Sequence, residues 1–255
     1  MNTYGLEWHR AIPEKLMSPN DVHVWRVFLD SPKLEKQSLL AILSIDELER
    51  VRRFHFEKDK KRFIVSRGIL RNILSHYQGI SPQKILFEYT PYGKPVFASK
   101  SGEATHCFNL SHSGEFALYA VSPERRVGID IERVRDDVSV DQISQKFYCH
   151  DEIIALEQIP KTDRTELFFQ YWTRKEALLK AAGEGISFPM EQCDVSLIGA
   201  GVLSPIRLPC NTNEEGSRWY VKDLSPGHGY VAAIAVDGGD CNISCWHPSL
   251  SQFPG

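Results

Sequence analysis

Apolar residues recur along this chain at two spacings, which predict short strands and amphipathic helices. A run of apolar residues over 22–29 suits a buried strand. Ser44, followed by Glu47 three positions later, is a capping box that predicts a helix over about 45–53. Apolar residues that lie close to one stripe predict a longer helix over about 58–77. The chain therefore contains both element types in its first third.

Residues 127–132 carry two acids on one face of a predicted strand. Three apolar residues alternate there with Gly128, Asp130 and Glu132, so a strand buries one set and presents both acids on its opposite face. Two carboxylates on one strand face form half of a metal site. This pattern is a candidate for divalent cation chemistry.

A predicted helix further along the chain carries a third acid. Trp172, Glu176 and Lys180 lie four residues apart on one stripe, and the helix is predicted to end at Gly183 and Gly185. If this stripe faces the strand, Glu176 supplies a third oxygen ligand. Sites made of oxygen ligands suit Mg²⁺ or Mn²⁺, which take further ligands from substrate phosphates, so we expect chemistry at a pyrophosphate.

The same residues also allow a simpler interpretation. Glu176 and Lys180 then form a solvated ion pair, worth about 0.3–0.5 kcal/mol, and the strand acids face water. Ion pairs at this spacing are common on helices. Each motif alone leaves this interpretation open.

The composition narrows the function by exclusion. The chain has 255 residues, 42% hydrophobic and 25% charged, which is enough for one large or two small globular domains. Its net charge of −3 argues against nucleic acid or a membrane as the main partner. We find no export signal and no apolar run of membrane-spanning length. The six cysteines lack zinc-site spacing, which favours reduced thiols in a cytoplasmic protein.

Two distant segments of the chain resemble each other. Residues 114–121 and 229–236 align with a match at one Gly, two Ala and one Val. The match is compatible with two related halves, and also with two similar buried strands that share no origin.

Four motifs follow one another in a recognisable order. They are residues 92–95 (Tyr-Gly-Lys-Pro), 108–113 (Phe-Asn-Leu-Ser-His-Ser), 128–132 (Gly-Ile-Asp-Ile-Glu) and 172–177 (Trp-Thr-Arg-Lys-Glu-Ala). In this order and spacing the chain resembles the 4′-phosphopantetheinyl transferases of the larger, surfactin-synthetase-activator (Sfp-like) type, in a spelling like that of cyanobacteria. The resemblance covers about residues 44–195. Four motifs in order are far more specific than any one of them.

The resemblance implies a fold and a division of the chain. It implies an α+β fold, a pseudo-dimer of two similar α+β subdomains with the active site in the cleft between them. The N-terminal subdomain, residues 1–125, would bind the 3′-phosphate of coenzyme A. The C-terminal subdomain, residues 126–255, would carry the metal-binding strand and the catalytic helix. A monomer is expected, because the second half replaces a partner subunit.

The reaction that the resemblance implies moves the 4′-phosphopantetheine arm of coenzyme A to a serine of an apo carrier protein, releasing adenosine 3′,5′-bisphosphate. The partners would be acyl or peptidyl carrier proteins of fatty-acid, polyketide or nonribosomal peptide synthases. Asp130, Glu132 and Glu176 would hold Mg²⁺, or Mn²⁺ in its place. One alternative is a relative that binds coenzyme A or carriers without turnover. Another Mg²⁺-dependent phosphotransfer enzyme would need its own nucleotide signature, and no Gly-rich phosphate loop is present.

The resemblance also assigns roles to single residues. Glu176 is expected to act as general base, directly or through a metal-bound water, and Lys180 to contact phosphate or orient that base. Ser111 and His112 match the pair that contacts coenzyme phosphates, where such donors stabilise charge without exchanging a proton. Lys175 is expected to contact the pantetheine or phosphate region.

The resemblance further implies a basic site for the 3′-phosphate. Arg50, Arg62 and Lys94 are expected to hold that phosphate. The other basic residues of 50–71 are interleaved with acids, and we interpret most of them as solvated. Glu47 departs from the pattern, because members of the family often have an additional lysine there.

Two further roles follow from position alone. Residues 146–148 offer basic and apolar side chains near the predicted cleft, where they can receive an acidic carrier. Trp172 is expected to pack and fix the helix rather than take part in chemistry.

Overall fold

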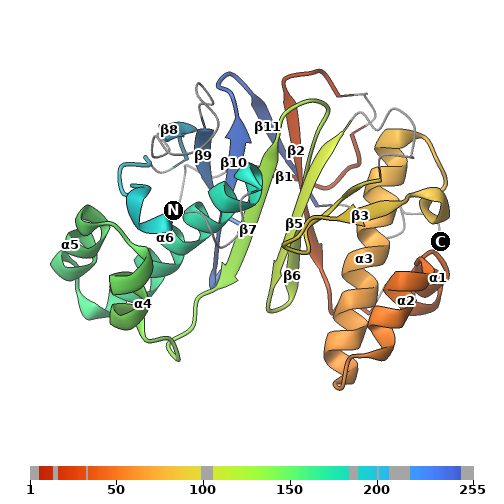
Figure 1. The fold of residues 1–255 in the computed structure, drawn as a ribbon, viewed down its shortest axis with the longest axis horizontal. Helices are drawn as coiled ribbons and strands as arrows, with labels where there is room; N and C mark the ends of the chain where they lie inside the picture. The colour runs from red at the N-terminus through yellow and green to blue at the C-terminus, as the bar shows by residue number, and fades with distance from the viewer. Residues whose placement is uncertain are drawn as a thin grey trace.

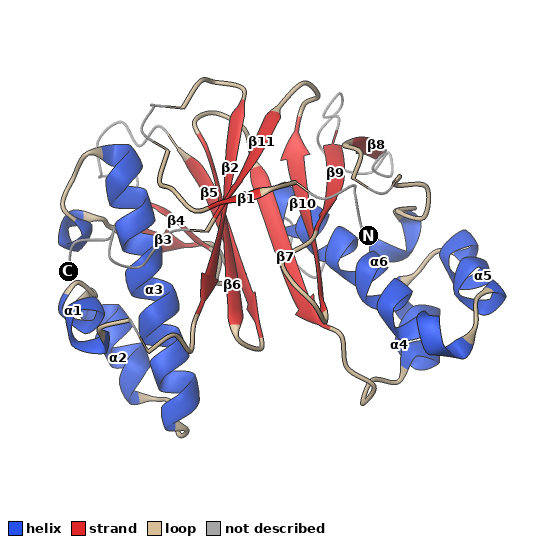
Figure 2. Ribbon diagram, turned by 180° about the vertical axis from the view of Figure 1, so that it is seen from behind, coloured by secondary structure: helices blue, strands red, loops and turns tan. Residues whose placement is uncertain are grey.

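The chain folds into two large β-sheets that pack face to face between two groups of helices, and two short strands form a third, antiparallel pair (Figures 1 and 2). The structure, a computed structural model, describes residues 6–13, 17–32, 34–98, 106–183, 189–199, 201–206 and 219–247. Its helices are α1 Lys36–Ala41, α2 Ile45–Arg52, α3 Glu57–Gln78, α4 Val140–Phe147, α5 His150–Gln158 and α6 Lys161–Ala182, with short 3₁₀ turns at Pro82–Lys84 and Met190–Gln192. Its strands are β1 Trp8–His9, β2 Asp21–Phe28, β3 Phe87–Tyr89, β4 Pro95–Phe97, β5 Cys107–Ser113, β6 Phe116–Ser122, β7 Val127–Arg133, β8 Ser204–Ile206, β9 Trp219–Leu224, β10 Tyr230–Asp237 and β11 Asn242–Trp246.

The first sheet has the order β1-β11-β2-β6-β5, and α1, α2 and α3 lie beside its outer face (Figure 1). Trp25 and Tyr119 project from this sheet into a core that includes Ile69 and Ile73 of α3. The helix α3 ends where Gly79 adopts a left-handed φ of 64°. The prediction of a longer helix over about 58–77 is confirmed.

The second sheet has the order β7-β10-β9-β8, and α6 crosses its outer face with α4 and α5 further out (Figure 1). Phe168 and Leu178 of α6 pack in a second core with Val221 of β9 and Ala233 of β10. The helix ends at Gly183, whose φ is 79°, as the sequence predicts. Gly185 lies outside the described residues.

A third core fills the space between the two sheets. Val24 and Leu118 enter it from the first sheet, and Ile129, Ile131 and Ile234 enter it from the second. The strands β6 and β10, which contain the two similar segments, both contribute to this core. Each half thus supplies a sheet and a long covering helix, and the predicted α+β fold of two subdomains is confirmed.

The last strand does not stay with its own half. Residues of β11 pair in parallel with β2, and β1 pairs with β11 in turn, so the first sheet contains a strand from the C-terminal part of the chain. This pairing covers an edge of β2 that would otherwise present unpaired backbone groups. Residues 126–255 are therefore not a structurally separate unit, which corrects that part of the expected division. The boundary near residue 125 stays a prediction about the two related halves.

Strands β5 and β7 lie side by side where the two sheets meet, joined by side-chain hydrogen bonds. Asn109 Oδ1 accepts the backbone N–H of Ile129 at 2.8 Å, and Ser113 Oγ accepts that of Arg133 at 3.1 Å. Asn109, Ser111 and Ser113 share one face of β5, because alternate residues of a strand point to the same side. The acidic face of β7 is consequently held against a row of polar side chains.

Gly128 lets α6 lie directly against β7. A Cβ atom at this position would overlap the backbone oxygen of Ala177 and the backbone nitrogen of Ala181. The close approach is therefore possible because residue 128 has no side chain. It brings Glu176 and Lys180 over the acids of the strand.

Replacing Gly128 with Ala is expected to lower the free energy of unfolding by about 1–3 kcal/mol, because helix backbone opposes the new methyl group. Urea denaturation measures this difference. The matched control is Gly199→Ala, whose Cβ would meet the Val202 side chain at an ordinary 3.7 Å. An equal loss of unfolding free energy in the two variants would contradict the close contact between α6 and residue 128.

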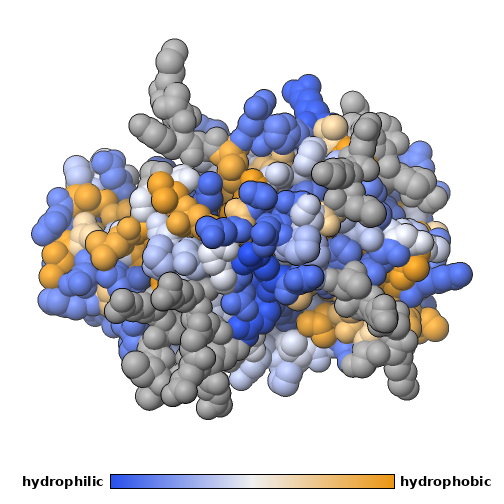
Figure 3. Space-filling view, turned by 90° about the horizontal axis from the view of Figure 1, so that it is seen from above, coloured by the Kyte–Doolittle hydropathy of each residue, from blue (hydrophilic) through white to orange (hydrophobic). Residues whose placement is uncertain are grey.

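Seen from above, hydrophilic side chains occupy the centre of this face of the molecule, and hydrophobic ones form separate groups toward its flanks (Figure 3). No helix among the described residues combines the length and apolar content needed to cross a membrane.

Candidate active site

Asp130 is the buried centre of the site, on the face of β7 that α6 covers. Its Oδ1 accepts hydrogen bonds from Lys180 Nζ at 2.6 Å and from Ser111 Oγ at 2.7 Å. Lys180 Nζ also lies 3.1 Å from Ser111 Oγ. The second carboxylate oxygen of Asp130, Oδ2, is buried and accepts no hydrogen bond from the residues that the structure describes. A buried carboxylate oxygen without a partner is costly, so this atom is suited to a cation.

Two further carboxylates surround Asp130. Burial raises the pKa of Glu132, and the charge of Asp130 adds to this, although Ser113 Oγ opposes it by donating to Glu132 at 2.8 Å. Burial also raises the pKa of Glu176, and the charges of Asp130 and Glu132 raise it further against the effect of Lys180. The three acids are close enough to destabilise one another's charge, which a bound cation would relieve.

A cavity of about 1110 Å³ lies beside these carboxylates, and Glu176 is the one of the three that lines it. The stripe Trp172, Glu176 and Lys180 lines it from α6, while Arg50 of α2 and Lys94 of the β3–β4 turn line it from the other half. Its volume suits a cofactor-sized ligand. The predicted stripe on α6 therefore faces both the acidic strand and this cavity.

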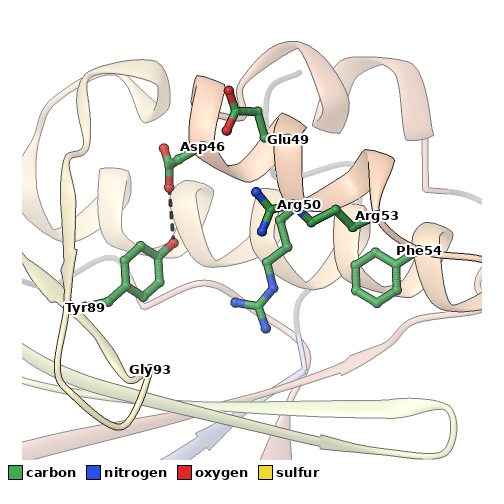
Figure 4. Close-up of a pocket in the computed structure, with 7 residues that line it drawn as sticks. All are labelled: Asp46, Glu49, Arg50, Arg53, Phe54, Tyr89 and Gly93. Carbon is green, nitrogen blue, oxygen red and sulfur yellow. Dashed lines mark hydrogen bonds between the residues drawn. The ribbon is translucent and has the colours of Figure 1, made fainter.

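A second cavity, of about 610 Å³, adjoins the first and shares Arg50 and Gly93 with it. Figure 4 shows Arg50 pointing between the rings of Tyr89 and Phe54. The Tyr89 hydroxyl donates to Asp46 Oδ2 at 3.5 Å. The guanidinium of Arg50, which lies beside these aromatic rings, can bind an anionic group of a ligand that extends from the larger cavity.

Lys175 lies outside the cavity, which corrects the expectation of a coenzyme contact. Its side chain is 1% exposed and forms an ion pair with Glu152 at 2.9 Å. Its ammonium also donates to the backbone oxygens of Met190 at 2.6 Å and Cys193 at 2.5 Å. One residue along a helix turns the side chain by about 100°, so Lys175 points into the core while Glu176 faces the cavity.

Arg62 is also not among the residues that line the cavity. Its Nη2 forms an ion pair with Asp30 at 2.6 Å, and this hydrogen bond lowers the pKa of that carboxyl. Arg67 of the same helix lines the cavity instead. The side chains of Arg67 and Arg71 are 7% and 1% exposed, so the interpretation of these two residues as solvated is wrong.

The chain matches known proteins over almost its whole length. Residues 126–235 match the 4'-phosphopantetheinyl transferase superfamily, and residues 31–124 match the family described as 4'-phosphopantetheinyl transferase, N-terminal. The 4'-phosphopantetheinyl transferase HetI of Nostoc sp. is 37% identical over 240 residues, which cover 94% of this chain and 98% of that relative. The chain belongs to the 4′-phosphopantetheinyl transferases.

More distant relatives are also described as phosphopantetheinyl transferases. The 4'-phosphopantetheinyl transferase Sfp of Bacillus subtilis is 28% identical over 215 residues, covering 84% of this chain and 91% of the relative. The L-aminoadipate-semialdehyde dehydrogenase-phosphopantetheinyl transferase of Mus musculus is 28% identical over 212 residues, covering 78% and 69%. The resemblance carried by the four motifs is confirmed. The protein is an enzyme of this class, which transfers phosphopantetheine from coenzyme A to carrier proteins.

The donor set of the transferase fits a divalent cation. Asp130, Glu132 and Glu176 offer carboxylate oxygens, the ligands that Mg²⁺ prefers. The unpartnered Oδ2 of Asp130 is an acceptor for such an ion. Lys180 neutralises part of the negative charge here through its contact with Asp130 Oδ1.

A different group of potential ligands lies closer together. Among the described residues, only Cys149, Glu152 and Asp194 have three ligand atoms within 4.8 Å of one another. Glu152 in this group is already satisfied by Lys175 and by the backbone N–H groups of Cys149 and Val195, each at 2.9 Å. We therefore interpret this cluster of the transferase as structural.

His112 is exposed at the end of β5 and lines the cavity. Desolvation within the cavity, followed by the charge of Lys180, lowers the pKa of His112 from its ordinary value. The imidazole is therefore mainly neutral at pH 7. This state suits a hydrogen-bonding role toward a phosphate better than a permanent positive charge.

Lys94 holds the turn of the N-terminal half against the end of α6. Its Nζ donates to the backbone oxygen of Lys180 at 2.7 Å. Burial lowers the pKa of Lys94 to about 8, and the charges of Lys180 and Arg126 act in the same direction. The ammonium of Lys94 therefore loses its proton at a pH near 8, where binding can be measured.

The affinity of the transferase for coenzyme A is expected to fall about fivefold between pH 7 and pH 9, because Lys94 is charged below pH 8 and neutral above it. Isothermal titration calorimetry at a series of pH values measures the change. In Lys94→Arg, whose guanidinium stays charged, the decline should be absent. Parallel profiles for both proteins would contradict a role for the Lys94 charge.

Sequence reasoning missed three residues of the site. Asn109 and Ser113 share the polar face of β5 with Ser111, so the alternation of that strand was the available signal. Arg67 lies four residues before Arg71, and this spacing placed both on one side of a predicted helix. The interleaved acids of that region made a solvated face the simpler interpretation.

Proposed function

We propose that this transferase moves the 4′-phosphopantetheine arm of coenzyme A to a serine hydroxyl of an apo acyl or peptidyl carrier protein, in a Mg²⁺-dependent reaction that releases adenosine 3′,5′-bisphosphate. The observation that carries the proposal is that Glu176 and Lys180 line one cavity together with residues of both halves, while Asp130, which Lys180 contacts, and Glu132 lie beside them. This arrangement supports chemistry at a pyrophosphate.

The proposed metal ligands are Asp130, Glu132 and Glu176. When bound there, Mg²⁺ would offset the charge that builds up on the pyrophosphate as its bond breaks, and Mn²⁺ suits the same donors. Ser111 fixes Asp130 by donating to Oδ1 at 2.7 Å. Ser113 does the same for Glu132 at 2.8 Å.

Glu176 is the proposed general base. The carrier serine must lose a proton as its oxygen attacks the β-phosphorus, and Glu176 is the one of the three carboxylates that lines the cavity. Glu176 receives this proton directly or through a water. Lys180, one helical turn away, donates to a phosphate oxygen and stabilises the charge of the departing bisphosphate.

The remaining contacts hold the coenzyme. Ser111 and His112 line the cavity beside the acids and are proposed to donate to its phosphate oxygens. Arg50 and Lys94 line the opposite wall and are proposed to contact the 3′-phosphate. The proposal leaves Arg62 and Lys175 out, because both have other partners.

The carrier is proposed to dock at the end of α4. Lys146 and Phe147 line the cavity there, and Lys146 is exposed. Carrier helices are typically acidic around the modified serine, so a lysine beside the opening suits them. Tyr148 does not contribute, because it is 3% exposed and packs in the core. We further propose that the protein acts as a monomer, since both walls of the cavity come from one chain.

Mass spectrometry of an intact apo acyl carrier protein tests the proposal. The carrier is incubated with the transferase, coenzyme A and Mg²⁺, beside a sample that contains EDTA and another with Mn²⁺ restored. We expect a phosphopantetheine mass gain that EDTA abolishes and either ion restores. Full transfer in EDTA would contradict the metal requirement, and no transfer to several unrelated carriers would contradict the broad carrier class.

A further inference from the structure

Glu47 is a buried acid beneath the coenzyme cavity, and its side chain is fully shielded from solvent. Its Oε2 accepts Arg71 Nε at 2.7 Å and the backbone N–H of Ser44 at 3.0 Å. Its Oε1 faces Arg67 Nε at 3.6 Å. Glu47 of α2 therefore holds two arginines of α3.

Arg71 is held by the protein at both Nε and Nη1. Besides Glu47, its Nη1 donates to the backbone oxygens of Pro82 at 2.9 Å and Ile85 at 2.8 Å. This arginine therefore fixes the segment that leads into β3. It lines neither of the two cavities.

Arg67 is engaged on one side only. Its guanidinium lies over the rings of Phe63, Phe87 and Tyr89, with centroid distances of 5.6, 5.7 and 5.8 Å. Its Nη1 is buried and donates no hydrogen bond to any described part of the chain, although the side chain lines the large cavity. A buried guanidinium donor without a partner is expensive, and an anion in the cavity would satisfy it.

We infer that Arg67 contacts the 3′-phosphate of coenzyme A and that Glu47 is the residue that positions it. The inference rests on the proposed function in taking coenzyme A as the ligand of this cavity. The pyrophosphate must lie at the carboxylates and Lys180 of α6. Arg67 belongs to the other wall, with Arg50 and the rings of β3, so the coenzyme anion within its reach is the one remote from the reacting phosphorus.

The identity of residue 47 follows from the same geometry. Two arginines converge on this one buried position, and a basic residue there would meet both of them without compensation. An acid at position 47 instead neutralises the pair and aims Arg67 at the cavity. The positive contact is thus supplied from α3 rather than from α2.

Binding measurements with two ligands test the contact. Isothermal titration calorimetry in EDTA, without a carrier, gives the dissociation constants for coenzyme A and for 3′-dephospho-coenzyme A. We expect Arg67→Met to weaken coenzyme A binding about tenfold or more, the effect of losing a charge-assisted hydrogen bond, and to leave the dephospho form nearly unchanged. The control is Arg52→Met, which removes the same charge from an exposed position of α2 outside both cavities.

The positioning role has its own test. Glu47→Gln is expected to weaken coenzyme A binding less than Arg67→Met does, and to add little in the double variant, because it acts through Arg67. Unchanged affinity for 3′-dephospho-coenzyme A shows in each case that the variant is folded. Additive effects would overturn the positioning role. Equal losses for both ligands in Arg67→Met, or no loss for either, would overturn the phosphate contact.

The binding result for Arg67 does not depend on whether the proposed reaction takes place. Binding in EDTA requires neither the metal nor a carrier, so a protein that fails to transfer the arm still reports on Arg67. Conversely, transfer that proceeds with unchanged coenzyme affinity in Arg67→Met removes this inference and leaves the reaction standing.

Discussion

Replacing Glu176 with Gln is expected to reduce phosphopantetheine transfer by about a hundredfold or more. The amide keeps the shape of the side chain but removes the charge that would hold the metal and the base that would receive the serine proton. The single-turnover rate, followed by mass spectrometry of the carrier, measures the effect.

The control for this variant lies on the same helix. Glu166→Gln removes an exposed carboxylate of α6 that does not line the cavity, and it should transfer at the native rate. Coenzyme A binding should survive in Glu176→Gln, because the proposed phosphate contacts remain. A variant that transfers within about threefold of the native rate would exclude Glu176 from the chemistry, given the effect expected of a general base.

Replacing Lys175 with Met is expected to lower the free energy of unfolding by about 3–5 kcal/mol. The change leaves the carboxylate of Glu152, which is fully shielded from solvent, without its ion-pair partner. It also removes the donor that Met190 and Cys193 share. Urea denaturation followed by circular dichroism measures the loss.

A second substitution separates charge from packing. The double variant Lys175→Met with Glu152→Gln should recover part of the lost stability, because no uncompensated charge stays buried. Lys161→Met, at the exposed start of α6, should be nearly neutral. If the double variant is less stable than Lys175→Met alone, the buried charge is not the cause.

The local elements could be predicted because their determinants are local. The long helices end at Gly79 and Gly183, where a left-handed glycine satisfies the last carbonyls, and the acidic strand is fixed by its alternation. The spacing of Glu176 and Lys180 on one stripe also placed both on the cavity side. These features follow from period and capping, which neighbouring residues determine.

The burial of charged residues could not be predicted in the same way. Lys175 and Glu176 are adjacent in a motif, yet one is buried with Glu152 and the other lines the cavity. Arg71 is buried against Glu47, which belongs to a different helix and is therefore not a neighbour in the sequence. A charge in a mixed sequence is solvated or buried according to a partner that only the tertiary structure supplies.

The strand β11 limits how the cavity can admit its ligands. The chain passes from the first sheet to the second before β7 and returns after β10, where β11 pairs with β2. Two covalent crossings and a shared core join the halves, so rotation of one half about a single hinge is not available. Coenzyme and carrier must therefore be admitted by movements of side chains and surface turns around a rigid frame, and binding should leave the radius of gyration of the protein unchanged.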